Sequence, residues 1–152
     1  MRRLTLIAGS GTLPPLMAAA ARRRGDTLQV IDLLGRGDIP GDQVEHLTLA
    51  QAPELITAVK LFRTSHMVLA GGVHISDADR EGLVNAFGFA GRMARVAGDI
   101  GIASMILMFC RMNRIKLIGA HEIAPDLLAP EGHIAGPPLD PAFAPSVKIA
   151  LN

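Results

Sequence analysis

The amino-terminal stretch constrains the fold of this chain most strongly, because it contains a strand, a glycine turn and a helix in immediate succession. The apolar residues 4–8 run into Gly9-Ser10-Gly11-Thr12, and the alanine-rich residues 15–24 follow. Glycine lets a backbone approach a ligand closely, and the N-terminus of the next helix directs unpaired N–H groups toward an anion. Ser10 and Thr12 add two hydroxyl donors. The sequence therefore predicts that this turn is the anion end of a ligand site.

The glycine spacing matches only part of a dinucleotide-binding fingerprint. That fingerprint is G-x-G-x-x-G after a strand, and here Gly9 and Gly11 fit while Pro14 occupies the third position. The third glycine serves close helix–strand packing, whereas proline at a helix start pre-sets φ. Asp32 ends the next apolar segment, near where a ribose-binding acid is expected. A NAD(P)-binding module remains one alternative, and a plain tight turn with Asp32 as a strand-end acid remains another.

Length and composition exclude several classes of protein. The 152 residues suit a single domain, and 49% apolar residues without Trp or Tyr predict an aliphatic core. A formal net charge of +1 gives no field that would favour nucleic acid. The single cysteine, Cys110, excludes an intrachain disulfide and is expected to be a buried, inert thiol. No signal segment follows Met1, and the apolar residues 100–109 are too few to span a bilayer, so a cytoplasmic location is expected.

The remaining pattern alternates between strands and helices, which predicts a parallel sheet with helices on both faces in a single α/β domain. Ser76 and Asp79 are predicted to form a capping box. The segment 102–112 is apolar nearly all round and is predicted to be a buried helix. Further strands are predicted at residues 27–34, 44–49, 66–70 and 115–118, and helices at residues 15–24, 53–64 and from 77 toward 96.

Three of the predicted strands are followed by polar or glycine-rich turns, at residues 9–12, 71–74 and 119–122. Ligands of open parallel sheets bind at the carboxyl ends of the strands. We therefore expect the three turns to converge on one edge of the sheet, and this convergence is a stronger sign of a site than any one turn.

Three sequence blocks carry a family resemblance. They are Ile-Ala-Gly-Ser-Gly-Thr-Leu-Pro at residues 7–14, Ala-Gly-Gly-Val at 70–73, and Gly-Ala-His-Glu at 119–122 followed by Asp-Leu-Leu-Ala-Pro-Glu-Gly at 126–132. In this order they resemble the amino-terminal half of the UDP-2,3-diacylglucosamine pyrophosphatases of the type without metallophosphoesterase motifs. The resemblance implies a Rossmann-like substrate-binding domain over residues 1–133, and a Pro/Gly-rich linker with the start of the next element over residues 134–152.

The resemblance also implies a function. Members of the family are cytoplasmic enzymes of lipid A synthesis that hydrolyse UDP-2,3-diacylglucosamine to UMP and 2,3-diacylglucosamine 1-phosphate with a divalent cation, Mg or Mn. Their essential acid belongs to a carboxyl-terminal domain, so this chain, which ends at Asn152, is expected to be inactive alone and to bind no cation by itself. Its expected partners are the substrate or the sugar-lipid phosphate product, the missing domain or a second copy, and the inner face of the inner membrane.

The residues expected to bind substrate follow from the matched blocks, and no catalytic or metal-ligating residue is assigned. They are Gly9, Ser10, Gly11, Thr12, Leu13, Gly71, Gly72, Val73, His121 and Glu122. The chain departs from the family pattern at His74-Ile75, where an arginine and a proline are usual, and at Ile100, where a second acid is usual.

A metal site at the third turn is the less favoured interpretation. His121, Glu122 and Asp126 supply a nitrogen and two carboxylates, but His-Glu lacks the second histidine that H-E-x-x-H provides. The alternative is that the two acids line a loop and the imidazole is partly buried. Three functions remain open: a substrate-binding half of a lipid A pyrophosphatase, a NAD(P)-binding module, and an interaction domain without activity.

Overall fold

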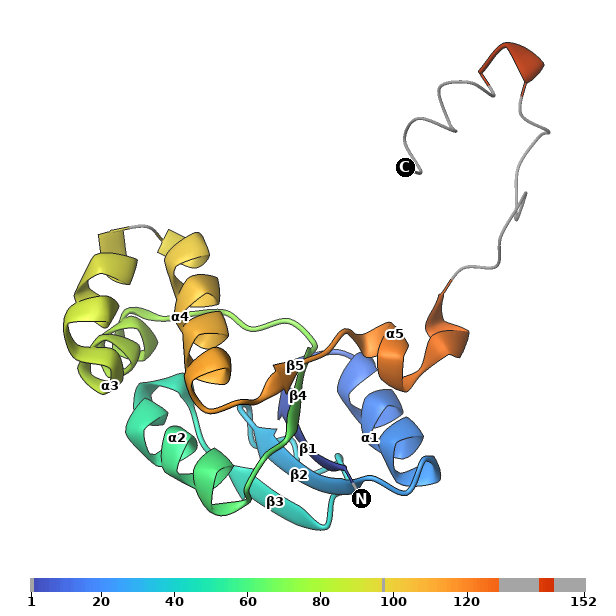
Figure 1. Cartoon of the computed structure of the whole chain (residues 1–152), viewed down its shortest axis with the longest axis horizontal. Helices are drawn as coiled ribbons and strands as arrows, with labels where there is room; N and C mark the ends of the chain where they lie inside the picture. The colour runs from blue at the N-terminus through green and yellow to red at the C-terminus, as the bar shows by residue number, and fades with distance from the viewer. Residues whose placement is uncertain (1, 97, 129–139, 144–152) are drawn as a thin grey trace.

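The computed structural model of the chain describes residues 2–96, 98–128 and 140–143 (Figure 1). The segment predicted as a linker, residues 134–152, lies outside the described residues except for a short 3₁₀ turn, Pro141–Phe143. The helix start predicted near residue 146 also lies outside them.

The described core is a five-stranded, entirely parallel sheet. Its strands are β1 (Arg3–Ala8), β2 (Thr27–Asp32), β3 (Gln43–His46), β4 (His66–Ala70) and β5 (Lys116–Leu117), in the order β3-β2-β1-β4-β5. The chain moves outward from β1 to β2 and β3, then crosses back to place β4 on the other side of β1. This confirms the predicted Rossmann-like α/β class and puts the topological switch point between β1 and β4.

Helices cover both faces of the sheet, as expected from the alternating pattern (Figure 1). Helix α1 (Leu13–Arg23) and the single turn α5 (Ala120–Ile123) lie on one face. Helices α2 (Ala52–Leu61), α3 (Asp77–Val96) and α4 (Gly98–Met112) lie on the other, together with the 3₁₀ turn η1 (Leu49–Gln51). A second 3₁₀ turn, η2 (Pro125–Leu127), follows α5.

Each strand contributes side chains to both faces of the sheet, because successive side chains of a strand point in opposite directions. On β4, Val68 and Ala70 pack toward α1, whereas Met67 belongs to the cluster beneath α2 and α4. We call the side that faces α1 and α5 the packed face, with Leu4, Leu6, Leu28, Val30, Val68 and Ala70 from the strands. The side that faces α2, α3 and α4 is the cavity face, with Ile7, Ile31 and Met67.

Helix α3 is anchored at its start and bent in its middle. The predicted capping box is confirmed, because the Asp79 carboxylate accepts from the Ser76 N–H at 3.0 Å and the Asp79 N–H donates to Ser76 Oγ at 3.2 Å. The Ala50 N–H of η1 also donates to Asp79, at 2.9 Å. Farther along, Gly88 has φ 57° and ψ −123°, which interrupts the helix. The helix is therefore fixed on η1 and changes direction at Gly88.

Helix α4 is less buried than its sequence predicts. Ile102, Met105, Phe109 and Cys110 are buried, but Leu107, Met108 and Met112 are 50%, 37% and 76% exposed. The prediction of a fully buried helix is therefore wrong for one side of α4. The prediction for Cys110 is confirmed, since the thiol is buried against Met67 and its burial raises its pKa. Among the described helices, none has the length and apolar character needed to cross a membrane.

Candidate functional site

The turns that follow β1 and β4 are joined by backbone hydrogen bonds at the switch point. The Gly9 N–H donates to the Ala70 carbonyl at 2.8 Å, and the Ser10 N–H donates to the Gly72 carbonyl at 2.8 Å. The Gly72 N–H returns a bond to the Ser10 carbonyl at 3.2 Å, and Ser10 Oγ donates to the Gly72 carbonyl at 3.0 Å. Two of the three turns expected to converge are therefore a single structure at the carboxyl edge of the sheet.

Two of the glycines are required by this close approach. A Cβ on Gly9 would lie 2.3 Å from the Gly72 carbonyl oxygen, and one on Gly71 would lie 2.3 Å from the Ser10 carbonyl oxygen. Gly71 also has φ +89°, a conformation that side chains disfavour. Both contacts are with backbone atoms, so a side chain at Gly9 or Gly71 would push the two turns apart.

Gly11 differs, because its surroundings are open. It has φ +90°, and a Cβ there would have no neighbour within 4 Å. The following residue, Thr12, is the N-cap of α1, is exposed, and makes no capping hydrogen bond with its side chain. The Ser10 hydroxyl is already bonded to the Gly72 carbonyl. The Thr12 hydroxyl, in contrast, does not cap α1 and is the hydroxyl of this turn that a ligand can reach.

The N-terminus of α1 offers fewer donors than a usual helix start. Pro14 and Pro15 lie in its first turn, and proline has no N–H. Leu13, partly buried against the packed face, carries the N–H that remains between Thr12 and these prolines. Because Pro14 and Pro15 carry no N–H, the expected unpaired N–H groups are limited to the turn residues and to Leu13, the first residue of the helix.

Arg36 is the functional candidate that sequence reasoning missed. Its guanidinium donates from Nη1 to the Gly9 carbonyl at 3.1 Å and to the Gly11 carbonyl at 2.5 Å. Its remaining nitrogens form a two-fold contact with the Asp38 carboxylate at 3.0 and 2.8 Å, and this bonding lowers the pKa of Asp38. The Arg36–Asp38 ion pair thus lies against the glycine turn. Arg36 sits in a loop of glycines and prolines whose course the sequence does not define.

Asp32 has a structural role in this arrangement. Its side chain is 2% exposed, and its two carboxylate oxygens accept from the N–H groups of Leu34 and Gly37 at 3.2 and 3.0 Å. Asp32 therefore shapes the loop that carries Arg36. Both oxygens are engaged by backbone, which agrees with the interpretation of Asp32 as a strand-end acid.

His121 and Glu122 do not join the glycine turns. The Glu122 carbonyl accepts from Arg24, the residue that follows α1, while the Glu122 carboxylate pairs with Lys116 at 3.1 Å. That contact and a bond from the Gly119 N–H lower the pKa of Glu122. Lys116 pairs with His66, four residues before the end of β4, or about 13 Å from the carboxyl edge at 3.3 Å per residue. The expected convergence of the third turn is therefore wrong.

This separation follows from the shortness of β5, which has two residues. The chain leaves the sheet early, and α5 packs Ile123 against α1 in the packed face. His121, Glu122 and Asp126 line a shallow depression with Arg23 and Arg24. Within the part of the chain that the structure describes, no three His, Cys, Asp or Glu residues are grouped so as to hold a metal ion.

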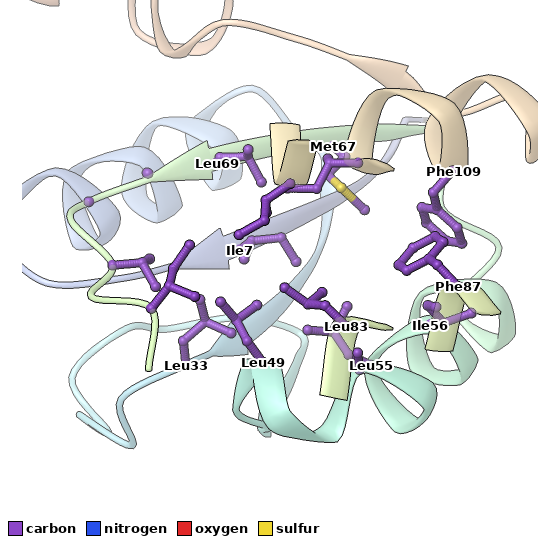
Figure 2. A pocket seen from close by; sticks show the side chains of 17 residues that line it. Ile7, Leu33, Leu49, Leu55, Ile56, Met67, Leu69, Leu83, Phe87 and Phe109 are labelled. Carbon is purple, nitrogen blue, oxygen red and sulfur yellow. The ribbon is translucent and has the colours of Figure 1, made fainter. Parts of the chain in front are cut away.

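An apolar cavity of about 270 Å³ lies on the cavity face, beside the joined turns (Figure 2). Val73 and Gly71, two of the residues expected to bind substrate, are part of its lining. The other lining residues come from the strands, from η1, from the three helices of this face and from two loops, namely Ile7, Leu33, Leu49, Ala52, Leu55, Ile56, Met67, Leu69, Ala70, Ile75, Leu83, Phe87, Ile102, Ile106 and Phe109.

The chain matches one family model over most of its length. Residues 3–127 match the family model of the LpxI N-terminal domain. The chain belongs to the LpxI N-terminal domain family. The match includes β1 to β5 and both joined turns, and it ends within η2. No curated protein is a significant match to this LpxI N-terminal domain.

Solved structures with some likeness to it are NAD-bound enzymes among others. WbmG of Bordetella bronchiseptica in complex with NAD and UDP has a TM-score of 0.48 and 19% identity, covering 77% of this chain and 36% of that one. WbmH of the same organism with NAD+ has a TM-score of 0.44 and 13% identity, with coverages of 57% and 34%. L-threonine 3-dehydrogenase of Trypanosoma brucei has a TM-score of 0.46 and 16% identity, with coverages of 78% and 36%. The chain spans about a third of the length of these proteins.

Proposed function

We propose that this LpxI N-terminal domain binds UDP-2,3-diacylglucosamine and is the substrate-binding part of a hydrolase of lipid A synthesis. The reaction would cleave the pyrophosphate of the substrate to give UMP and 2,3-diacylglucosamine 1-phosphate. The family match over residues 3–127 supports the substrate class. The observation that carries the proposal is the joined pair of glycine turns at the switch point, where open parallel sheets bind their ligands.

The turn after β1 has the chemistry to hold a phosphate of this substrate. Gly11 is open to approach, and the Thr12 hydroxyl faces solvent. The Arg36 guanidinium, which is paired with Asp38, donates to the Gly9 and Gly11 carbonyls and so fixes the shape of the turn. Gly71 and Val73, in the turn after β4, line the apolar cavity beside it. These groups bind and orient a phosphate, and none of them is a base for water.

The described carboxylates do not fit a divalent-cation site at the turns. Hard cations require several oxygen ligands, and pyrophosphate hydrolysis requires a cation beside the scissile bond. Glu122 is paired with Lys116 and, like Asp126, lies near the far end of α1, an 11-residue helix about 16 Å long. We therefore assign binding to this domain. The Mg or Mn and the essential acid would come from a carboxyl-terminal domain, with the complete enzyme at the inner face of the inner membrane.

Binding is tested by the melting temperature of the chain with UDP-2,3-diacylglucosamine, UMP and NAD. A ligand that binds only the native state stabilises it, by about 2.7 kcal/mol at one hundred times its Kd. We expect the melting temperature to rise with UDP-2,3-diacylglucosamine and to stay constant with NAD. A rise with NAD alone would replace the proposal by the dinucleotide-binding alternative, and a rise with none of the three would favour an interaction domain.

The site itself is tested by a matched glycine pair. Gly11 and Gly25 both have positive φ, +90° and +75°, and a Cβ at either would have no neighbour within 4 Å. Gly11→Ala and Gly25→Ala should therefore cost similar stability, about 1–2 kcal/mol of backbone strain. Only Gly11→Ala should weaken binding of UDP-2,3-diacylglucosamine, because its methyl group would stand where the phosphate approaches the turn. We expect a loss of binding free energy of about 1.4 kcal/mol, which corresponds to a tenfold weaker affinity. Equal affinities of the two variants would place the phosphate elsewhere.

Turnover is tested separately by following UMP release with magnesium or manganese. We expect no release at an enzymatic rate from this chain. Robust turnover that is lost in Glu122→Ala or Asp126→Ala would move the chemistry into this domain and overturn the assignment of binding alone.

A further inference from the structure

The cavity on the cavity face has an apolar lining. All of its lining side chains are apolar, and they belong to strands, helices and the loops after β2 and β4. A buried water needs two to four polar partners, which apolar walls do not supply, and apolar cavities of smaller volume than this one bind hydrocarbons instead. An unfilled apolar cavity also lowers the stability of a fold in proportion to its volume. The space therefore suits a hydrocarbon ligand.

The cavity is closed at one end and accessible at the other. Phe87 and Phe109 meet edge to face, with ring centroids 6.3 Å apart, at one end, and Leu33 lies toward the other (Figure 2). The walls near the phenylalanines are buried: Met67 is 3% exposed and Phe109 8%. Toward the glycine turns, Leu69 and Val73 are 43% and 40% exposed. The cavity thus opens at the carboxyl edge of the sheet.

Leu69 is the most informative of these residues. It lies on β4, with β1 on one side, and its neighbours Val68 and Ala70 are almost fully buried. Its exposure arises because β5 reaches only as far as Met67 and because, among the residues that the structure describes, no side chain fills the space in front of it. A leucine on an inner strand is thereby left as the wall of an open hydrophobic space.

We propose that this cavity binds one aliphatic chain, with its polar end at the joined glycine turns. On the proposed function, which this inference deepens, the aliphatic chain is one acyl group of UDP-2,3-diacylglucosamine. At about 30 Å³ for each methylene, close to the volume of one water in the liquid, the cavity of 270 Å³ holds about nine carbons. Gly71 and Val73 belong both to the turns and to the lining, so phosphate and hydrocarbon can be held side by side.

The methionines allow a direct test on the unmodified chain, by NMR with ¹³C-labelled methionine methyl groups. Met67 lines the cavity, whereas Met17 is equally buried, at 1% exposed, on the packed face. Met108 and Met112 lie on the exposed side of α4 and report adsorption to the surface. The probes are decanoate, UDP-2,3-diacylglucosamine and UMP. We expect decanoate and the diacyl compound to shift the Met67 signal and to leave Met17, Met108 and Met112 unchanged.

Chain length gives a second readout. Burial of one methylene is worth about 0.8 kcal/mol, so each added carbon should tighten carboxylate binding about fourfold. The gain should stop once the cavity is full, near nine or ten carbons by the volume argument above. A gain that continued unchanged to fourteen carbons, or shifts confined to Met108 and Met112, would show adsorption to the surface and overturn the proposal.

A matched pair of variants ties the site to the substrate. Leu69→Trp places an indole in the cavity mouth, and Leu61→Trp places one on the outer side of α2, where Leu61 is 78% exposed and outside the lining. We expect at least tenfold weaker binding of decanoate and of UDP-2,3-diacylglucosamine in Leu69→Trp, and parental affinity in Leu61→Trp.

The outcomes separate the two proposals. Parental affinity of Leu69→Trp for UDP-2,3-diacylglucosamine would overturn the cavity proposal and leave the proposed function standing. A Met67 shift with decanoate, without binding of the diacyl compound or UMP, would support a site for an aliphatic chain and overturn the proposed function. A Met67 signal that responds to neither lipid would overturn the cavity proposal, whether or not Leu69→Trp folds.

Discussion

The packed face and the cavity face are formed by the same strands, yet only one of them is filled. On the packed face, Leu4, Leu28 and Val30 are fully buried beneath α1. On the cavity face, Leu69 is 43% exposed and a space of about 270 Å³ remains. The difference therefore lies in the helices that cover each face.

Side-chain size explains the packed face. Helix α1 presents Ala18 and Ala21 to the strands, both with no exposed surface. Small side chains let a helix lie close to a sheet, so the larger strand residues fill the interface at the density typical of protein interiors. On the other face, α3 contacts α4, η1 and α2, and the bond from Ala50 to Asp79 keeps it on η1. A helix supported by other helices leaves space above the strands.

The largest difference between the faces should appear when a buried methionine is removed. Met17 and Met67 are 1% and 3% exposed, on the packed face and the cavity face respectively. Methionine to alanine in a core costs about 2–5 kcal/mol, and the loss is greatest where every side of the residue has contacts. We expect Met17→Ala near the upper end and Met67→Ala near the lower end. Urea denaturation measures both, and an equal loss would contradict the comparison.

A smaller difference in stability between the two faces is expected when a buried alanine is replaced by leucine. Ala18 on α1 has no exposed surface, and Ala52 on α2 is 3% exposed and lines the cavity. Ala18→Leu should destabilise the fold by about 1–3 kcal/mol, because the packed face has no room for added atoms. Ala52→Leu should be neutral or stabilise by about 1 kcal/mol, as cavity-filling changes do. Thermal unfolding of the two variants decides between them. A larger loss for Ala52→Leu would mean that the cavity does not admit the side chain.

The smallest expected effect is a pH dependence of stability that arises from His66 on β4. Burial, followed by the charges of Arg2 and Lys116, lowers the pKa of His66 below its ordinary value of 6.5. The unfolded chain then binds more protons than the folded one just below that value, so the free energy of unfolding falls as the pH drops through 6.5. We expect His66→Gln to reduce this slope, measured by denaturation from roughly pH 8 to roughly pH 5. An unchanged slope in the variant would assign it to other groups.

The strands and the joined turns were accessible from sequence because they depend on local patterns. The predicted strand at residues 66–70 matches β4, and the helix predicted at residues 15–24 differs from α1 by two residues at its start and one at its end. The strand predicted at residues 44–49 ends early, at His46, because Thr48 caps the 3₁₀ turn η1 instead of continuing the strand. Boundaries depend on such capping contacts, which a hydrophobic pattern does not contain.

The candidate site was predictable only in part, for a different reason. Glycine turns after strands are visible in the sequence, but the position of a turn along the sheet depends on strand length, and β5 is two residues long. That shortness moves His121 and Glu122 away from Gly9 and Gly72. Arg36 and the cavity depend on the courses of loops and on the spacing of helices. Neither quantity is encoded in the periodicity of a single segment.

The bonds between Ser10 and Gly72 have a consequence for how the site arises. These residues are 62 positions apart in the chain, and they meet only because β1 pairs with β4. Closing so long a segment costs chain entropy before any contact compensates for it, and such distant parallel pairing is slow. Until β1 pairs with β4, the glycine turn after β1 lacks its partner turn. The joined turns therefore depend on the central strand pair, and the amide hydrogens of Ser10 and Gly72 should be protected from exchange as long as the two turns stay bonded.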